Sequence, residues 1–344
     1  MSKTYKKAIV LFNLGGPDKL DSVKPFLFNL FNDKNIITLP SFLRWIVAFI
    51  ISNLRAKTAK EIYSMMGGGS TILSQTEKQA LALKKALLQE CENDIEVFIC
   101  MRHWHPMTDE VLNKLASYRP DEIILLPLYP HFSTTTTASS IDCFLSKQKN
   151  TTLKNIKTKA ICCYPEDKNF IEAHVSLIKK EIENEKNYII LFSAHGLPEK
   201  TIAAGDPYQW QITRSVNLIT DSLKIPEKNY KITYQSKVGP MKWLSPNTED
   251  EIVAAVNAKK DIIIVPIAFV SEHSETLVEL DIEYKKLAKG HNIKYKRVST
   301  LGINETYIKS LTKMVKNIDS AEEKITSSSQ KRLCPKNYSK CPCR

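Results

Sequence analysis

The sequence has few glycines and no long apolar run, although its 344 residues are enough for two domains of ordinary size. Ten glycines, with 43% hydrophobic and 25% charged residues, exclude collagen-like and disordered chains. The longest uninterrupted apolar run, residues 45–51, has seven residues, whereas a membrane-spanning helix needs about 20. The apolar run at residues 8–12 is too short for a secretion signal and lacks a small-residue cleavage site. We therefore expect a soluble, cytoplasmic protein.

Basic residues outnumber acidic residues by 49 to 37, which gives a net charge of +12. Such a charge favours an anionic membrane face, an anionic ligand or nucleic acid as a partner. The lysines are scattered over predicted helices, and the sequence contains neither zinc-finger spacing nor a basic stripe interleaved with aromatic residues. We therefore expect no nucleic-acid partner.

Three short apolar runs in the first half of the chain have counterparts, in the same order, in the second half. The matching pairs are residues 8–12 and 188–192, residues 95–100 and 232–234, and residues 123–129 and 262–268. Amphipathic stripes with helical spacing fill the intervals, and Ser74 and Glu77 form a capping-box pattern before the apolar positions of one predicted helix. Continuous apolar strands that alternate with such helices predict parallel sheets covered on both faces.

The expected fold class is therefore α/β, with two similar doubly wound, Rossmann-like domains and an active-site cleft between them. We place the first domain at residues 1–166 and the second at residues 167–319. A tail of residues 320–344 follows, and it holds three of the eight cysteines.

Residues capable of chemistry follow the apolar runs, at the strand ends where ligands bind in such folds. His195 comes directly after one predicted strand and before Gly196-Leu197-Pro198, so its ring is expected at the edge of the cleft. The alternative is a histidine that only bonds to the backbone of a tight turn. Arg102 and His103 follow a second predicted strand in the same way.

The segment 272–283 holds five acidic residues and His273 but no basic residue. On a helix, Glu275, Glu279 and Glu283 would form one line of like charges, which is locally destabilising. Such a line is either a solvated acidic face or a path for cations or protons. Imidazole and carboxylate without thiolate favour acid–base catalysis or transient binding of a divalent metal over a closed zinc site.

The motifs resemble, in the same order and over residues 8 to about 318, those of the ferrochelatases, which insert ferrous iron into a porphyrin. The most specific are LFSAHGLP at residues 191–198 and AGDPY at residues 204–208. The resemblance implies haem biosynthesis with protoporphyrin IX and Fe²⁺ as substrates and release of two protons. It assigns catalysis and Fe²⁺ binding to His195 and Glu275, and a proton or metal path to His273, Glu279 and Glu283. The porphyrin pocket would comprise Leu14, Ser70, Arg102, His103, Tyr208, Met241 and Trp243.

Two departures from the family pattern occur in this set. Position 103, often tyrosine in the family, is histidine, and position 272, often aspartate, is glutamate. Both changes keep a polar side chain at the position.

Residues 36–54 are rich in large apolar side chains, and the resemblance implies a hydrophobic lip over the porphyrin mouth. Exposed Trp45, Ile46, Phe49 and Ile50 could then contact a bilayer, which predicts peripheral membrane association. The alternative for this segment is a buried helix.

Cys334, Cys341 and Cys343 have C-x₆-C-x-C spacing near the C-terminus. Thiolates favour iron–sulfur or zinc sites. The spacing resembles that of bacterial ferrochelatases in which these cysteines and an internal one bind a [2Fe-2S] cluster. The fourth ligand would be Cys163 or Cys162.

Two other functions stay open. One is insertion of iron into coproporphyrin, or of cobalt into a related tetrapyrrole, by an enzyme of the same superfamily. The other is a non-catalytic carrier of haem or metal, although a carrier gains nothing from acidic side chains beside an apolar ligand.

Overall fold

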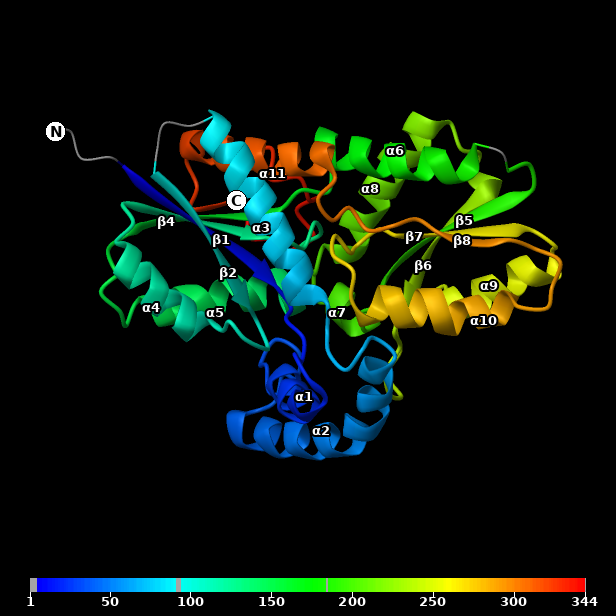
Figure 1. Cartoon of the computed structure of the whole chain (residues 1–344), viewed down its shortest axis with the longest axis horizontal. Coiled ribbons are helices and arrows are strands. Elements are labelled where there is room, and N and C mark those ends of the chain that lie inside the picture. Colours follow the sequence, from blue (N-terminus) through cyan, green and yellow to red (C-terminus); the bar gives the residue numbers. More distant parts are fainter. Residues whose placement is uncertain (1–4, 91–93, 184, 344) are drawn as a thin grey trace.

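The computed structural model describes residues 5–90, 94–183 and 185–343, which form two parallel β-sheets flanked by helices (Figure 1). The strand order is β2-β1-β3-β4-β9 in the first sheet and β6-β5-β7-β8 in the second. This arrangement confirms the expected α/β class.

In the first sheet, β1 (Lys6–Asn13) lies between β2 (Asp94–Met101) and β3 (Glu122–Pro127), and β4 (Lys157–Cys163) follows. The apolar residues of β1 are almost fully buried, as expected for a parallel strand covered on both faces. The edge strand β9 (Ile325–Ser327) comes from the segment we expected to be a separate tail. The tail is therefore joined to the first sheet.

The second sheet repeats the arrangement of the first. Its central strand β5 (Tyr188–His195) lies between β6 (Tyr230–Gln235) and β7 (Asp261–Pro266), and β8 (Tyr295–Arg297) forms one edge. The apolar runs that match between the two halves of the sequence therefore form strands in equivalent places, because the order β2-β1-β3 corresponds to β6-β5-β7.

Helices and helical turns connect the strands. The α-helices are α1 (Val23–Phe31), α2 (Ser41–Ser64), α3 (Ile72–Glu90), α4 (Thr108–Tyr118), α5 (Ser139–Gln148), α6 (Lys168–Ile182), α7 (Glu199–Ala203), α8 (Tyr208–Leu223), α9 (Thr248–Asn257), α10 (Lys285–Ala288) and α11 (Glu305–Asn317). The π-helices are η2 (Thr134–Ala138) and η4 (Glu275–Tyr284), and the 3₁₀ turns are η1 (Leu20–Ser22), η3 (Glu227–Asn229) and η5 (Ile318–Ser320).

One apolar core extends along the same face of both sheets. It combines Leu11 of β1 and Phe192 of β5 with side chains of α3, α6 and α11, and α11 packs against both α3 and α6. The prediction of a capping box at Ser74 and Glu77 is wrong. Helix α3 already begins at Ile72, and the Ser74 hydroxyl donates to the Thr71 carbonyl oxygen from within the first turn.

Helices α1 and α2 lie apart from the two sheets (Figure 1). The alternative of a buried helix for this segment is wrong, because Phe42, Trp45, Phe49 and Ile50 are all about half exposed or more. The rings of Trp45 and Phe49 stack at 5.6 Å on this open face. In the described part of the chain, none of the helices has the length and apolarity needed to span a bilayer.

Candidate active site

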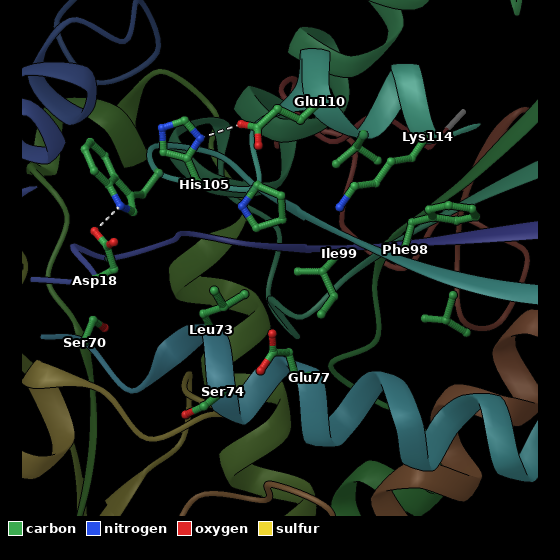
Figure 2. Close-up of a pocket in the computed structure, with 15 residues that line it drawn as sticks. Asp18, Ser70, Leu73, Ser74, Glu77, Phe98, Ile99, His105, Glu110 and Lys114 are labelled. Atoms are coloured by element: carbon green, nitrogen blue, oxygen red, sulfur yellow. Dashed lines mark hydrogen bonds and ion pairs between the residues drawn. The ribbon is translucent and has the colours of Figure 1, made fainter. Parts of the chain in front are cut away.

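A cavity of about 640 Å³ opens beside β2, the edge strand of the first sheet (Figure 2). Its lining includes two hydrogen-bonded pairs, Trp104 Nε1 with Asp18 at 2.9 Å and His105 Nδ1 with Glu110 at 2.5 Å. Of the expected site residues, the described lining contains Ser70 alone. The residues suited to the chemistry are therefore elsewhere.

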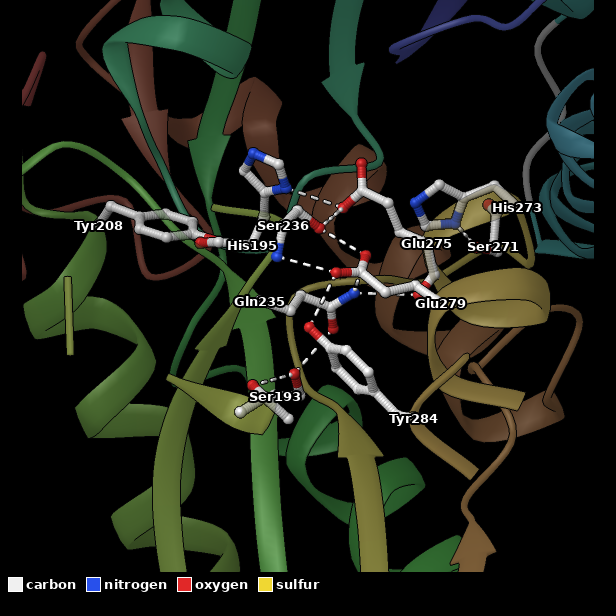
Figure 3. A network of polar contacts seen from close by, with 11 residues as sticks. Ser193, His195, Tyr208, Gln235, Ser236, Ser271, His273, Glu275, Glu279 and Tyr284 are labelled. Carbon is white, nitrogen blue, oxygen red and sulfur yellow. Dashed lines mark hydrogen bonds and ion pairs between the residues drawn. The ribbon is translucent and has the colours of Figure 1, made fainter. Parts of the chain in front are cut away.

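His195 and Glu275 meet at the carboxyl ends of the second sheet's strands (Figure 3). His195 is the last residue of β5, and Glu275 is the first residue of the π-helix η4, which follows β7. Because β5 and β7 are parallel neighbours, their ends bring the two side chains together, with His195 Nδ1 2.8 Å from Glu275 Oε2. The His195 side chain is 37% exposed and that of Glu275 is 23% exposed, so the pair is accessible.

The two groups shift each other's proton affinity. Burial would raise the pKa of Glu275, but the His195 charge and hydrogen bond, with His273 nearby, lower the pKa to about 2. Burial would lower the pKa of His195, but the Glu275 carboxylate outweighs it and raises the pKa. Glu275 is therefore ionised at neutral pH. Nε2 of His195 makes no hydrogen bond to the described residues.

Glu279 lies one turn further along η4 and accepts four hydrogen bonds. Its donors are Gln235 Nε2 (2.8 Å), Ser236 N (2.9 Å), Ser236 Oγ (2.6 Å) and the Tyr284 hydroxyl (2.9 Å). Burial, with the Glu275 charge as the next cause, raises the pKa of Glu279. These bonds hold Ser236 at a φ of 64°, a left-handed conformation that is costly for a residue with a side chain. The Ser236 hydroxyl is also 3.4 Å from Glu275 Oε2, so it lies between the two carboxylates.

Glu275, Glu279 and Glu283 keep to one side of the π-helix. Its hydrogen bonds join residues five apart and widen each turn, so residues four apart fall just short of one full turn. Glu275 and Glu279 are partly buried whereas Glu283 is exposed, so the line leads from His195 to the surface. His273 precedes the helix, is buried, and lies with Nδ1 3.0 Å from the Ser271 carbonyl oxygen.

Several expected pocket residues lie around His195. Tyr208 begins α8, and its hydroxyl donates to the His195 carbonyl oxygen at 3.1 Å. Trp243 Nε1 donates to the Val238 carbonyl oxygen at 2.9 Å, and the Trp243 ring meets the His195 ring edge to face at 6.5 Å. Gly196 permits this packing, because a Cβ at position 196 would lie 3.0 Å from the Gln235 carbonyl oxygen. Met241, on the same loop as Trp243, is 42% exposed.

Leu14, Arg102 and His103, three other expected pocket residues, directly follow strands of the first sheet. Leu14 follows β1, and its carbonyl oxygen accepts from the His103 amide at 3.0 Å. Arg102 lies beside them with a side chain that is 19% exposed. His103 is fully buried with no hydrogen bond to either ring nitrogen, and burial, followed by the Arg102 charge, lowers its pKa to about 3. The His103 ring is therefore neutral and closed off from solvent.

Asp206, within the AGDPY motif, joins the two halves of the chain, a role that the motif alone did not indicate. Asp206 is fully buried and caps two helices, with Oδ1 accepting from the Tyr208 amide at 3.0 Å and Oδ2 from the Thr134 amide at 2.7 Å. Its position directly before Pro207 and Tyr208, at the start of α8, was the available signal.

Five cysteines form one buried cluster with Phe132: Cys162, Cys163, Cys334, Cys341 and Cys343. All five are free thiols, and Cys162 Sγ lies 3.3 Å from Cys343 Sγ and 3.6 Å from Cys163 Sγ. Side chains that follow one another in a strand normally point to opposite faces of the sheet. The pairing of β4 with β9 is irregular between Ile161 and Cys163, which explains why the Cys162 and Cys163 side chains lie close together. No three His, Cys, Asp or Glu side chains among the described residues are arranged to hold a single metal ion.

The chain was compared with known protein families, sequences and structures. The family model described as Ferrochelatase matches residues 6–318. A ferrochelatase of Rickettsia felis is 54% identical and one of Pelagibacter ubique 50%, and each alignment covers 98% of both chains. Among solved structures, the sirohydrochlorin chelatase SirB from Bacillus subtilis in complex with cobalt matches with a TM-score of 0.53 at 10% identity, covering 88% of this chain and 91% of that chain. SirB with Fe³⁺ matches with a TM-score of 0.52 at 13% identity, covering 92% of this chain and 96% of that chain.

The structural matches support the fold alone, because their identities are low. The family model and the relatives go further and confirm the resemblance found in the motifs. The chain therefore belongs to the ferrochelatase family, and it is an enzyme that inserts ferrous iron into a porphyrin for haem biosynthesis.

Proposed function

We propose that His195 accepts the pyrrole protons of protoporphyrin IX, and that Glu275 orients the imidazole ring of His195. The observation that carries this proposal is the 2.8 Å contact between His195 Nδ1 and Glu275 Oε2. When Nδ1–H donates to Glu275, Nε2 keeps its lone pair and can take a proton. The Glu275 carboxylate then stabilises the imidazolium that forms.

Metallation replaces two pyrrole N–H bonds by bonds to Fe²⁺ and releases two protons. His195 can hold one proton at a time, so the first must leave before the second arrives. The pKa of Glu279 is raised and that of Glu275 is lowered, so a proton on Glu279 is favoured over one on Glu275. We infer that protons pass from His195 along Glu275 and Glu279 to the exposed Glu283. His273 lies beside Glu275, where this path begins.

The proposed porphyrin pocket comprises Leu14, Arg102, Tyr208, Met241 and Trp243, while the buried His103 supports this lining from within and Ser70 faces the cavity beside β2. Apolar contact with the large macrocycle face can supply binding energy to bend the ring, which exposes the nitrogen lone pairs to iron. Trp243 and Met241 suit this role because both lie on the loop after β6, and the Trp243 ring packs against the His195 ring. The exposed apolar face of α2 supports the further proposal that the mouth of the pocket contacts a membrane surface.

We also propose that the cysteine cluster holds a [2Fe-2S] group. The residues fit it, because such a group takes four thiolates and the cluster offers five buried free thiols. Cys334, Cys341 and Cys343 supply three, and the 3.3 Å contact with Cys343 favours Cys162 over Cys163 as the fourth. When bound, the group would cross-link the tail to β4.

Anaerobic insertion of Fe²⁺ into protoporphyrin IX, followed by absorbance, tests the proposed role of His195. We expect His195→Ala to reduce kcat by about 10²-fold or more while the porphyrin still binds. His105→Ala is the matched control, because His105 is an exposed histidine in the separate cavity beside β2. Activity of His195→Ala within about threefold of the parent would contradict the proposal.

The same assay separates the alternatives. Faster turnover of coproporphyrin than of protoporphyrin IX, or of Co²⁺ than of Fe²⁺, would assign the chain a different substrate within the superfamily.

A further inference from the structure

A buried carboxylate joins the segment between α1 and α2 to the expected porphyrin pocket. The Asp33 side chain is 1% exposed, and Oδ2 lies 2.9 Å from Arg102 Nη2. The Ser139 hydroxyl also donates to this oxygen. Arg102 Nε in turn donates to Ser139 Oγ at 2.6 Å, so the three side chains form a closed set of contacts.

Asp33 also organises the backbone that follows it. Its Oδ1 accepts from the Asn35 amide at 2.9 Å. Its carbonyl oxygen accepts from the amides of Ile36 (3.0 Å) and Ile37 (2.9 Å). The same residue therefore holds Arg102 and shapes the first turn of the lip segment.

A second set of bonds continues from this turn to α2. Arg44 Nε donates to the Asn32 carbonyl oxygen at 2.9 Å, and Arg44 Nη1 donates to the Leu39 carbonyl oxygen at 2.8 Å. Asn29 of α1 adds a further tie, because its Nδ2 donates to the His103 carbonyl oxygen at 3.2 Å. An unbroken series of contacts thus leads from Arg102 through Asp33 to the exposed apolar helix α2.

The energetics favour a rigid connection. A buried ion pair repays the desolvation of its charges only when its geometry is good and the remaining hydrogen bonds are satisfied. Movement of the lip segment away from Arg102 would leave the Asp33 carboxylate buried without its counter-charge. Movement of Arg102 would have the same effect, so neither is free to shift alone.

We propose that Asp33 is a positioning residue that couples the pose of Arg102 to the placement of the lip, residues 36–54. The inference rests on the proposed place of Arg102 in the porphyrin pocket. Its consequence is that Arg102 and the mouth of the pocket respond together to a bound porphyrin. Substrate binding and the membrane-facing helix are then linked through a single carboxylate.

Amide hydrogen exchange of the full-length protein tests the coupling without turnover. We expect Arg102→Met to speed exchange of the Asn35, Ile36 and Ile37 amides by about tenfold or more, because Asp33 loses its main partner. The Asn35 amide bonds to the Asp33 carboxylate, the Ile36 and Ile37 amides bond to the Asp33 carbonyl oxygen, and none of them bonds to Arg102, so the effect would pass through Asp33. His105→Gln, three residues further along the same segment, should leave their exchange unchanged. Exchange within about twofold of the parent in Arg102→Met would overturn the proposal.

Kinetics supply a second readout. We expect Asp33→Asn to raise KM for protoporphyrin IX by about tenfold with kcat within about threefold, because positioning of the pocket changes and the reacting groups do not. Ser139→Ala removes a neutral partner without leaving a buried charge, so it keeps the test open if Asp33→Asn fails to fold. Ser139→Ala should raise KM in the same direction, and a fall in kcat at constant KM in either folded variant would refute the positioning role. Failure of the His195 proposal would be seen in His195→Ala and would leave the exchange results unaffected.

Discussion

Two buried histidines predict how the stability of this protein depends on pH. His131 and His174 are 2% and 1% exposed, and neither ring nitrogen of His174 has a hydrogen-bond partner. Burial lowers the pKa of each to about 3, and for His131 the neighbouring His174 adds to the effect. The perturbation we choose is His174→Leu, because it removes the titrating ring without breaking a hydrogen bond.

The sign follows from the two pKa values. The unfolded chain binds a proton on His174 near pH 6.5, whereas the folded protein keeps the ring neutral down to a pKa of about 3. Stability from this residue is therefore complete above pH 6.5 and is lost as pH falls from 6.5 toward 3. At pH 5 the loss is about 2 kcal/mol for one histidine.

Urea unfolding of the parent and of His174→Leu at pH 8 and pH 5 measures this loss. At pH 8 the difference in unfolding free energy between the two proteins reports only the change in packing. On going to pH 5, the difference should move by about 2 kcal/mol in favour of the variant. If this difference in unfolding free energy changes by less than about 0.5 kcal/mol between pH 8 and pH 5, the protonated His174 ring must gain solvent or a partner in the folded protein, and the reasoning is refuted.

The remaining predictions concern the acidic line, the cysteine cluster and the core. At limiting Fe²⁺, Glu275→Gln should be severely impaired and Glu279→Gln and Glu283→Gln progressively less; parent-like rates in all three would make the line a solvated face. Cys341→Ser should bleach the visible absorption of anaerobically purified protein and lower its melting temperature; a colourless, iron-replete parent would contradict the cluster. Lys159→Met should lower the unfolding free energy by about 2–4 kcal/mol in urea, because buried Lys159 Nζ donates to the carbonyl oxygens of residues 318, 319 and 321 at 2.6–3.0 Å. A loss below about 1 kcal/mol would mean that water replaces these bonds.

The strands could be predicted because burial on both faces leaves a direct mark on the sequence. Residues 8–12 and 188–192 are unbroken apolar runs, and each forms an inner strand of a parallel sheet. The position of His195 followed from the same pattern. A polar residue that directly follows a run of buried strand residues lies at the carboxyl end of that strand, where ligands bind in such folds. Its partner Glu275 was identified by charge anomaly and by family resemblance, and the structure brings the two together.

Single buried polar residues could not be predicted in this way. Asp33 is 69 positions from Arg102, and Asp206 is 72 positions from Thr134. Neither acid belongs to a periodic pattern, and although Asp206 lies within the AGDPY motif, the sequence does not show that its carboxylate is buried or which partners it meets. The π-helical form of residues 275–284 was also hidden, because apolar and acidic residues four apart suit an α-helix nearly as well.

The carboxylate of Asp206 connects features that the sequence presented as separate. One oxygen caps α8 and the other accepts from Thr134, so the two halves of the chain share a single buried charge between two helix starts. The loop before it also receives the tail: the Lys340 amide donates to the Gly205 carbonyl oxygen at 3.1 Å, and a Cβ at position 205 would lie 2.9 Å from the Ser339 nitrogen. On its other side, Tyr208 donates to the carbonyl oxygen of His195. The cysteine-bearing tail and the histidine at the cleft are therefore held by the same four residues, 205–208, so that a shift of the tail must be absorbed within this loop or passed on to His195.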